Sequence, residues 1–260
     1  MKRSVTVSVV SHGQALMLTD LLQDLSQISS CRTSTVNRVV VTHNLPQPDW
    51  HCPVELNDCC HSIENRHPRG FAANHNAAFA WCDTEWFAVV NPDIRFSNDV
   101  FAQLIARAKP QDAILGPALL DPKSERAAPN RGLLTPWEIL RRRMPDWQPA
   151  VDPVWLPGAF LLIRSEMFRR VGGFDERFYL YAEDFDLCAR LRLAGGQLHF
   201  VQDISVRHAA QRHSHVQWRY LRWHVTSLLR LWCSPSIWRY RALLRSEARA
   251  ASVPTDQRPR

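Results

Sequence analysis

The segment "AVVNPDIRF", residues 88–96, begins as an apolar run and changes character abruptly at Asn91-Pro92-Asp93. Together with the "EWF" before it, this run predicts a buried strand over residues 85–90. An amide, a proline and a carboxylate therefore follow directly after a strand that is apolar along its length. Either a structural or a functional role could explain why these three residues follow the strand.

The chain on both sides of this segment alternates strand and helix patterns. Apolar runs predict further strands at residues 4–10, 37–44, 112–116 and 155–164. Helical spacing, alanine content and capping signals predict helices over residues 16–25, 70–82, 136–143, 166–173 and 182–196, with Ser165 as the N-cap of the fourth. This order is typical of an α/β fold built on a largely parallel sheet.

Polar residues follow several of the predicted strands, at positions 11–13, 43–44 and 91–93. Ligands of a parallel sheet bind beyond the carboxyl ends of its strands, where the strand order reverses. A Pro-Asp pair after a strand is also ordinary turn chemistry, so Asp93 alone has two explanations. A carboxylate at that edge would be held by rigid backbone and still reach the crevice.

A second acidic group lies at the start of the last predicted helix, where Glu183, Asp184 and Asp186 occupy three of four positions. One carboxylate there would complement the helix dipole, which is the structural explanation. Three carboxylates repel one another and lose solvation when they are partly buried. Their number therefore favours a functional role over simple capping.

Composition excludes several classes of protein. The 260 residues suffice for one large or two small domains with a sizeable core. Seven cysteines without a Cys-x-x-Cys pair suggest neither a disulfide framework nor a zinc site, which favours a reducing, cytoplasmic setting. The N-terminus does not resemble a signal peptide, and no apolar run approaches the length of a membrane span.

The net charge of +7 is concentrated near the C-terminus. Residues 207–260 contain eleven Arg and two acidic residues, so the first 206 residues carry a charge of −2. Four of the ten tryptophans also lie in this basic region. An apolar stripe at helical spacing is predicted there, formed by Trp218, Leu221, Val225, Leu228, Leu229 and Trp232.

This basic, aromatic segment has three interpretations. The plainest is a C-terminal helix whose stripe packs on the body of the protein while its arginines stay solvated. Association with a membrane surface is the second, since Trp and Arg suit the headgroup region. Nucleic-acid binding is disfavoured, because no recognition module accompanies the arginines. The last residues, 249–260, are predicted to be disordered.

Six motifs together resemble the family 2 glycosyltransferases of the GT-A fold, especially their rhamnosyltransferase-like branch, and the resemblance runs from about residue 5 to about residue 232. In chain order these motifs are "VSVVSH", "GFAANHN", "NPDI", "LPGAFLLIR", "GGFDERFYLYAEDFDLCARLRLAGG" and "VRH". The fifth is highly specific, whereas "NPD" alone is weak.

The resemblance implies a GT-A type, Rossmann-like α/β fold, with a mostly parallel central sheet flanked by helices and a C-terminal helical extension. Residues 1–210 would form the catalytic domain, divided into a nucleotide-sugar half at about 1–116 and an acceptor half at about 117–210. Residues 211–248 would form the basic helical segment packed on it.

The resemblance also implies a metal site. The family's metal motif is Asp-x-Asp, and here Asn91-Pro92-Asp93 stands in its place. Asp93 matches the metal-binding position, and His208 matches a position that can supply another ligand. Mg²⁺ or Mn²⁺ would suit these donors and share the phosphates of the substrate. Asn91 would hydrogen-bond a ribose or phosphate without adding charge.

Glu183 and Asp184 match the family's catalytic carboxylate motif. Asp184 is predicted to be the general base that accepts the proton of the attacking hydroxyl, with Glu183 orienting the acceptor or raising the proton affinity of its neighbour. The reverse assignment stays open. Asp186 would cap the helix or hold Arg190 at i+4.

Residues matching the family's nucleotide-binding positions are Ser11, His12, Asn44, Asn65 and Asn76. The family more often has a pair such as Tyr-Asn where Ser11 and His12 stand. Loop and helix capping is an equal explanation for Asn65 and Asn76. Trp155 would stack on a sugar or a lipid, or belong to the core.

The predicted function is therefore inverting, metal-dependent transfer of a sugar, rhamnose or a related deoxysugar, from a dTDP- or UDP-linked donor. The acceptor would be a bacterial surface glycan or a polyprenyl-linked glycan at the inner face of the cell membrane, with peripheral membrane contact and no nucleic acid. The alternative is a non-catalytic relative that binds sugar nucleotides or glycans through a degenerate metal motif. Nucleotidyl transfer ranks lower, because "SHGQALM" is not a phosphate-binding loop.

Overall fold

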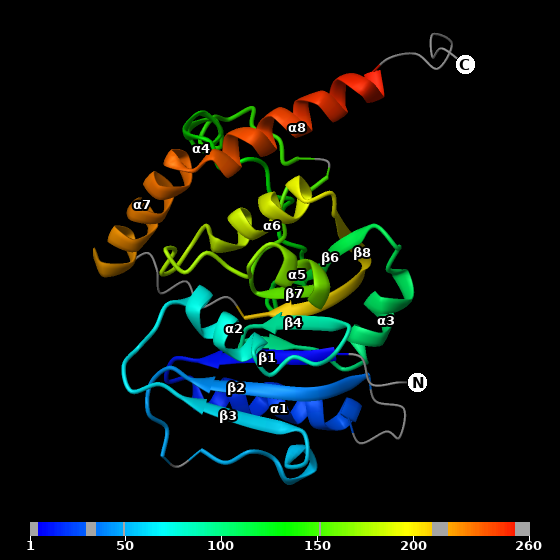
Figure 1. Ribbon diagram of the computed structural model, residues 1–260, viewed down its shortest axis with the longest axis vertical. Helices are drawn as coiled ribbons and strands as arrows, with labels where there is room; N and C mark the ends of the chain where they lie inside the picture. Colours follow the sequence, from blue (N-terminus) through cyan, green and yellow to red (C-terminus); the bar gives the residue numbers. More distant parts are fainter. Residues whose placement is uncertain (1–4, 30–34, 49, 151, 210–217, 253–260) are drawn as a thin grey trace.

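The structure is a computed structural model that describes residues 5–29, 35–48, 50–150, 152–209 and 218–252. One mixed sheet of eight strands forms its centre, in the order β3-β2-β1-β4-β7-β6-β8-β5 (Figure 1). The strands are β1 (Val5–Ser11), β2 (Val36–His43), β3 (Cys60–Glu64), β4 (Trp86–Val90), β5 (Ile94–Arg95), β6 (Asp112–Leu120), β7 (Phe160–Arg164) and β8 (Gln197–His208).

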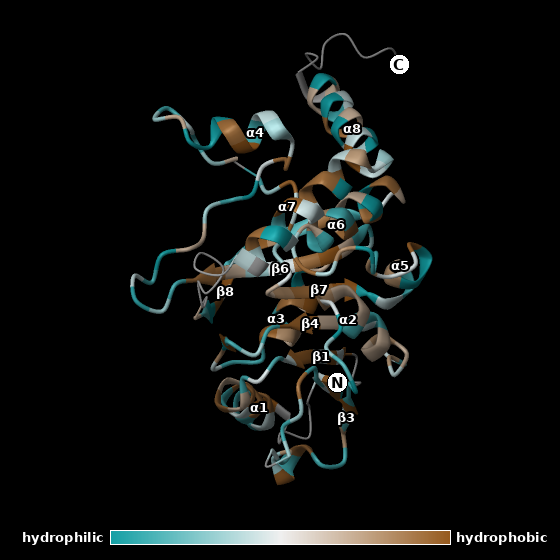
Figure 2. Ribbon diagram, turned by 90° about the vertical axis from the view of Figure 1, so that its left-hand side faces the viewer, coloured by the Kyte–Doolittle hydropathy of each residue, from teal (hydrophilic) through white to brown (hydrophobic). Residues whose placement is uncertain are grey.

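Helices cover both faces of this sheet. They are α1 (Ala15–Ser29), α2 (Phe71–Phe79), α3 (Val100–Arg107), α4 (Pro136–Arg141), α5 (Ser165–Arg170), α6 (Glu183–Leu193), α7 (Trp218–Cys233) and α8 (Pro235–Ser252), with a short 3-10 helix at Val54–Leu56. Figure 2 shows α1 and α3 on one side of the sheet, with α2 and α5 on the other.

Successive side chains along each central strand point to opposite faces of the sheet and so contribute to two separate cores. In β4, Ala88 and Val90 pack into the core under α1 and α3, whereas Phe87 and Val89 pack into the core that includes α2, α5 and α6. Successive side chains of a strand point to opposite faces, so a sheet covered on both faces needs apolar residues throughout. That requirement explains why β4 is an unbroken apolar run.

The carboxyl ends of the parallel strands meet at one edge of the sheet. Strand β1 pairs in parallel with both β2 and β4, so the chain reverses its winding at β1. Such a reversal opens a crevice at the strand ends. Register places Ser11 beside His43, His43 beside Glu64, and Val9 beside Val90 at this edge.

Antiparallel strands complete the same edge from the other half of the chain. Strand β7 runs against β4 and begins there, with Phe160 beside Val90. Strand β5 pairs with the end of β8, which puts Ile94 beside His208. The edge therefore gathers the starts of β5 and β7 and the ends of β1, β2, β3, β4 and β8, from positions far apart in the sequence.

The α/β fold predicted from the sequence is confirmed, with several local differences. Four of the seven strand pairings are parallel and three are antiparallel. Strands β3 and β5 and helix α3 were not predicted, and no residue range was predicted for β8. Ser165 as an N-cap is wrong: it is the first helical residue of α5, and Arg164 occupies the cap position without a side-chain cap.

The C-terminal helices α7 and α8 pack above α6 (Figure 1). Ser227 Oγ donates to the carbonyl of Leu180 at 2.8 Å, Tyr240 to that of Val154 at 2.6 Å, and Trp232 Nε1 to that of Leu134 at 2.7 Å. Helix α8 continues past the expected end at 248, and residues 253–260 of the predicted disordered tail lie outside the described residues.

The predicted packing of the α7 stripe is largely wrong. Ser227, Leu228 and Leu231 are buried, whereas four members of the stripe are exposed: Trp218, Leu221, Val225 and Leu229. Among the described residues, no helix has the length and apolar character to cross a membrane.

Candidate active site

The acidic end of α6 begins after a strained turn. Tyr181 and Ala182 both have positive φ angles, 73° and 67°, although neither is glycine. Left-handed backbone costs about 1–3 kcal/mol at such residues and clusters at functional sites. The turn brings Glu183 and Asp184 to the N-terminus of α6, where the helix dipole favours negative charge.

Asp184 is partly buried and is fixed by backbone donors on both oxygens. The N–H of Gly158 donates to Oδ2 at 2.9 Å, and the N–H of Phe185 donates to Oδ1 at 2.8 Å. Burial raises the pKa of Asp184, an effect opposed by these hydrogen bonds and by the charge of Arg131. A carboxylate with a raised pKa and a fixed orientation suits proton acceptance.

Glu183 is more deeply buried than its neighbour, with 5 % of its surface exposed, and its Oε2 has no hydrogen-bond partner within the described part of the chain. Burial, and then the charge of Asp184, raise the pKa of Glu183 well above its usual range. Two adjacent carboxylates cannot both ionise easily in such surroundings. The two carboxylates therefore differ in their surroundings. Glu183 is buried, whereas Asp184 is partly exposed and accepts two backbone hydrogen bonds.

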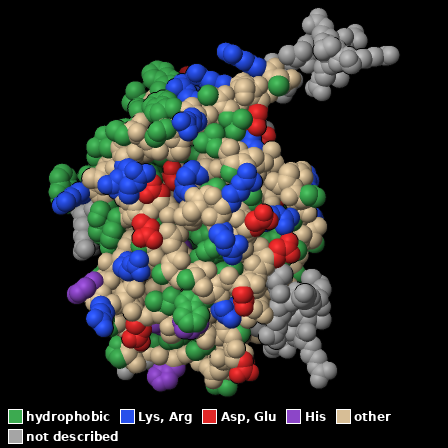
Figure 3. Space-filling model, viewed as in Figure 1, with side chains coloured by type: hydrophobic (Ala, Val, Ile, Leu, Met, Phe, Trp, Pro, Cys, Tyr) green, Lys and Arg blue, Asp and Glu red, His purple; other side chains and the backbone are tan. Residues whose placement is uncertain are grey.

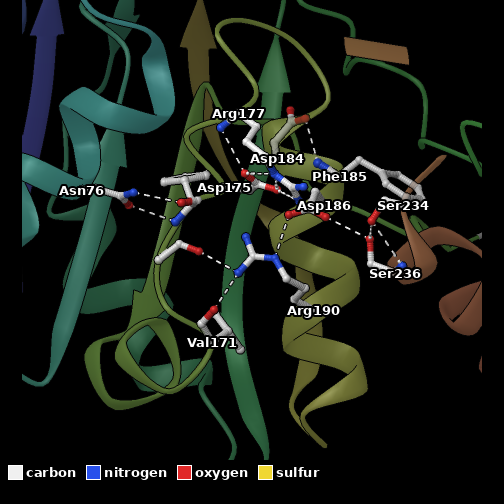
Figure 4. Close-up of polar contacts among 12 residues, drawn as sticks. Asn76, Val171, Asp175, Arg177, Asp184, Phe185, Asp186, Arg190, Ser234 and Ser236 are labelled. Atoms are coloured by element: carbon white, nitrogen blue, oxygen red, sulfur yellow. Dashed lines mark hydrogen bonds and ion pairs between the residues drawn. The ribbon is translucent and has the colours of Figure 1, made fainter. Parts of the chain in front are cut away.

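Asp186 braces the helix. Its Oδ2 accepts from Arg190 Nε at 2.7 Å, and its Oδ1 accepts from Ser236 Oγ of α8 at 2.9 Å. Arg190 in turn donates to the carbonyls of Val171 and Gly173, at 2.8 and 2.7 Å (Figure 4). Of the two roles considered for Asp186, holding Arg190 is the one the structure shows.

Asp93 and His208 lie together, on the loop after β4 and at the end of β8. His208 Nε2 is 3.4 Å from Asp93 Oδ2, while Asp93 Oδ1 is buried and has no hydrogen-bond partner among the residues that the structure describes. The N–H of Ala209 donates to the Asp93 carbonyl at 3.1 Å, which fixes the pair from the backbone. An unpaired carboxylate oxygen next to an imidazole fits a divalent cation that also binds substrate phosphates.

The chain itself supplies only part of such a metal site. In the portion of the chain that the structure describes, no group of three or more His, Cys, Asp or Glu side chains is positioned to hold a metal. Two protein ligands are consistent with a cation that keeps several waters and shares phosphate oxygens.

A short backbone link joins the Asp93 loop to Asp184. The N–H of Asn91 donates to the carbonyl of Ala159 at 2.9 Å, and the adjacent Gly158 holds Asp184. A Cβ on Gly158 would lie 3.3 Å from the Phe71 ring and 3.6 Å from Asp184 Oδ2. Both predicted functional elements thus contact one turn, residues 157–159.

Four of the predicted nucleotide-binding residues meet at the ends of β1, β2 and β3. Asn44 Nδ2 contacts His12 Nδ1 at 3.1 Å and donates to the Arg69 carbonyl at 2.9 Å. Asn65 Nδ2 donates to Asn44 Oδ1 at 2.8 Å and to Asn74 Oδ1 at 2.7 Å. These amides form one network at this edge of the sheet.

Ser11 belongs to the same edge through residues that the sequence did not single out. Its Oγ accepts from Gln47 Nε2 at 2.8 Å and from the N–H of Gln14 at 3.2 Å. The N–H of Asn44 also donates to the Ser11 carbonyl at 2.8 Å.

Asn76 makes different contacts from the other predicted nucleotide residues. Its Nδ2 donates to the Phe174 carbonyl at 2.9 Å, and its Oδ1 accepts from the N–H of Phe174 at 2.9 Å (Figure 4). The same Nδ2 also donates to Glu176 Oε1 at 3.1 Å. Gly173 must be glycine here, because a Cβ would lie 2.5 Å from Asn76 Oδ1. Asn76 thereby joins α2 to the loop before α6.

The contact between Arg131 and Trp155 was not predicted from the sequence. The Arg131 guanidinium lies over the Trp155 ring, 5.5 Å from its centroid, and Trp155 Nε1 donates to the Gly132 carbonyl at 2.9 Å. The ring of Trp155 also contacts Phe185, at 6.1 Å between centroids. Trp155 is therefore a core residue against which Arg131 stacks. Burial raises the pKa of Asp184, and the positive charge of Arg131 opposes that rise. No sequence pattern pairs residues 131 and 155.

Comparison with known proteins identifies the family. The model of glycosyltransferase like family 2 matches residues 52–230. The chain belongs to this family. An N-acetylglucosaminyl-diphospho-decaprenol L-rhamnosyltransferase of Mycobacterium tuberculosis is 35% identical over 153 residues, 51% of this chain and 49% of that protein. Rhamnosyltransferase WbbL of Escherichia coli is 42% identical over 77 residues, 29% of each chain.

Solved structures show the same fold. A mannosyltransferase of Pyrobaculum calidifontis, in complex with GDP-Man and Mn²⁺, superimposes with a TM-score of 0.61 at 17% identity, over 86% of this chain and 62% of that one. GalNAc-T7 with UDP, GalNAc and Mn²⁺ gives 0.59 at 15% identity, over 79% and 43%. The predicted family and GT-A fold are confirmed, while the matches span at most about half the length of these two curated relatives.

Proposed function

We propose that this chain transfers a sugar from a nucleotide-diphosphate donor to a hydroxyl of a bacterial surface glycan or a polyprenyl-linked acceptor. One observation carries the proposal: Asp184 is held by backbone donors next to the turn that also binds the Asn91–Asp93 loop. The names of the two rhamnosyltransferases support rhamnose or a related deoxysugar as the transferred group. We propose dTDP or UDP as the nucleotide of the donor.

Asp184 would act as the general base. The acceptor hydroxyl attacks the anomeric carbon from the side opposite the leaving diphosphate, so the configuration inverts, and its proton passes to an Asp184 oxygen. A positioned carboxylate contributes about 10²- to 10⁴-fold to such a step. The greater burial of Glu183 favours a role in orienting the acceptor.

Asp93 and His208 would hold Mg²⁺ or Mn²⁺, and the orphaned Asp93 Oδ1 supports this assignment. When bound, the cation neutralises charge that develops on the leaving diphosphate. Asn91 carries no charge, so the affinity for metal should depend on the diphosphate. The network of His12, Asn44 and Asn65 would then bind the base and ribose of the donor.

A thermal-shift panel of nucleotide sugars, with and without Mn²⁺, tests this function. A donor that binds only the native state stabilises it by about 2.7 kcal/mol at a hundredfold excess over Kd. Each hit is then assayed for transfer or slow hydrolysis. Binding without turnover, equal in the Asp184→Asn variant, would favour the non-catalytic alternative. No shift with any sugar nucleotide would overturn the proposal.

A further inference from the structure

Exposed apolar side chains gather at one end of the molecule. Among the described residues, twelve large hydrophobic side chains are exposed, and eight of them lie on α4, the turn after it, α7 and α8. They are Trp137, Leu140, Met144, Trp218, Leu221, Val225, Leu229 and Trp238. These three helices occupy the upper end of the molecule in Figure 1. We refer to this set as the apical face.

The apical face has a regular centre on α7. Leu221, Val225 and Leu229 are 49, 46 and 52 % exposed and recur every four residues. Side chains at that spacing form one stripe along a helix. The opposite side of α7 is already buried, through Ser227 and Leu231. The stripe is therefore additional to the apolar surface that attaches α7 to the protein.

Unpaired positive charge surrounds the stripe. Apart from Arg249, six arginines on the same elements are exposed: Arg141, Arg143, Arg222, Arg230, Arg239 and Arg245. None has an acidic side chain within 4.0 Å in the described chain. Three acidic residues lie on the described parts of these elements: Glu138, Asp146 and Glu247. Arg192 binds Glu247, at 2.6 Å to each oxygen, so only Glu138 and Asp146 remain to offset the charge of the arginines. Figure 3 shows basic and hydrophobic side chains side by side over this region.

This combination favours one kind of partner. An anionic lipid surface accepts guanidinium groups at its phosphates and apolar side chains below them, and tryptophan suits the boundary between the two. Nucleic acid would satisfy the arginines but would leave Leu221, Val225 and Leu229 in water. A second copy in a symmetric dimer would bring the same arginines together.

The buried side of α7, which carries the exposed stripe on its other side, contacts the segment that leads into the strained turn before α6. Ser227 Oγ of α7 donates to the carbonyl of Leu180, and the Trp223 ring lies 4.7 Å from that of Tyr179. Leu180 precedes the strained pair at Tyr181 and Ala182, next to Glu183. A surface bound to α7 would consequently lie on the side of the molecule that supports the acceptor half.

We propose that the apical face docks on an anionic phospholipid surface, with α7 lying along it. This inference does not depend on the reaction proposed above, although it fits a lipid-linked acceptor. It predicts that arginines and apolar side chains both contribute, because each supplies a separate part of the binding free energy.

The experiment is co-sedimentation of the full chain with vesicles of phosphatidylcholine alone or with one quarter phosphatidylglycerol. We expect binding to the anionic vesicles only, weakened by salt. Arg222→Gln with Arg230→Gln should lower the partition coefficient about 30-fold, because each lost charge lowers it roughly fivefold. Leu221→Gln with Leu229→Gln should lower it at least about tenfold.

Matched controls lie at other sites on the surface. Leu16 and Val54 are 84 and 79 % exposed, so their glutamine variants test the loss of exposed apolar residues in general. Lys109→Gln with Lys123→Gln, both at exposed positions, tests the loss of surface positive charge in general. Unchanged thermal midpoints and unchanged donor binding would show that the apical variants fold.

Three results would overturn the inference. These are no binding to anionic vesicles, an equal loss of binding in the control variants, or sedimentation as a dimer that the Leu221 and Leu229 changes abolish. The last result would assign the apical face to a second copy. A catalytically inactive protein that still binds vesicles would contradict the proposed reaction alone.

Discussion

The N–H of Gly158 donates to Asp184 Oδ2 at 2.9 Å, so the turn before β7 holds the carboxylate at the start of α6. Because the N–H of Phe185 occupies Oδ1, both oxygens accept backbone hydrogen bonds. An amide at this position has one acceptor and one donor group, and it cannot satisfy both N–H groups. The arrangement therefore selects a carboxylate on structural as well as chemical grounds.

Asp184→Asn should lower transfer by at least about 10²-fold and also lower the free energy of unfolding by about 1–3 kcal/mol, because one backbone N–H loses its acceptor. Kinetics and urea unfolding measure the two effects. Asp203→Asn, at an exposed ion pair with Arg107, is the control and should change neither by much. Near-normal turnover of Asp184→Asn would remove this residue as the base.

Asp93→Asn should abolish most of the Mn²⁺-dependent part of donor binding while leaving the fold intact. The substitution removes a charge and a hard oxygen ligand, whereas the backbone bond from Ala209 remains. The readout is the difference in donor-induced thermal shift with and without Mn²⁺. His208→Gln should give a smaller loss of the same kind. A full Mn²⁺ response in Asp93→Asn would contradict the assigned ligand.

The pH dependence of stability should reveal the buried Glu183. Burial raises its pKa well above the ordinary value of 4.5, so its stabilising effect is full below that ordinary value and is lost as the pH rises through the folded-state pKa. Relative to the Glu183→Gln variant, the native protein should lose up to about 1.4 kcal/mol per pH unit across this interval. Urea unfolding of both proteins at several pH values measures this slope, and parallel curves would refute the prediction.

Arg131→Gln should move the acidic limb of the activity profile to higher pH. The positive charge of Arg131 opposes the rise in the pKa of Asp184, so its removal raises that pKa further and protonates the base at a higher pH. The measurement is kcat/KM against pH. Arg131→Lys keeps the charge and should retain most of the original profile, whereas an identical profile in both variants would exclude an electrostatic role.

Asn76→Ala should act mainly on stability. It removes three hydrogen bonds between α2 and the loop at residues 174–176, at a cost of about 1–3 kcal/mol. The donor Kd should stay within about twofold, whereas Asn44→Ala should weaken donor binding. A large effect of Asn76→Ala on donor Kd at unchanged stability would instead support the role predicted from the sequence.

Local sequence patterns were sufficient for the strands and helices that define the crevice. Residues 85–90 and the acidic start of α6 were placed correctly because burial on both faces and helix-terminal charge leave strong local signals. Strand β3 was missed because its sequence, "CHSIE", is largely polar and only partly buried. The capping signal of α3, Asp99 accepting from the N–H of Ala102, was present but not used.

Relationships between distant segments could not be predicted in this way. A stripe pattern shows which residues of α7 share a face. Which face is covered depends on the segment that packs against the helix, and here Ser227 faces that segment because its Oγ donates to the Leu180 carbonyl. The stacking of Arg131 on Trp155 likewise depends on how two loops return to the sheet.

The left-handed pair at Tyr181 and Ala182 has a consequence for attempts to make this protein more heat-resistant. Glycine adopts positive φ without steric cost, so changing either residue to glycine relieves strain in the folded chain, whereas the greater freedom of the unfolded chain opposes that gain. Where the relief of strain is the larger effect, screens that reward only thermal tolerance would select changes at the two positions that lead into Glu183 and Asp184. Gains found there should be weighed against turnover.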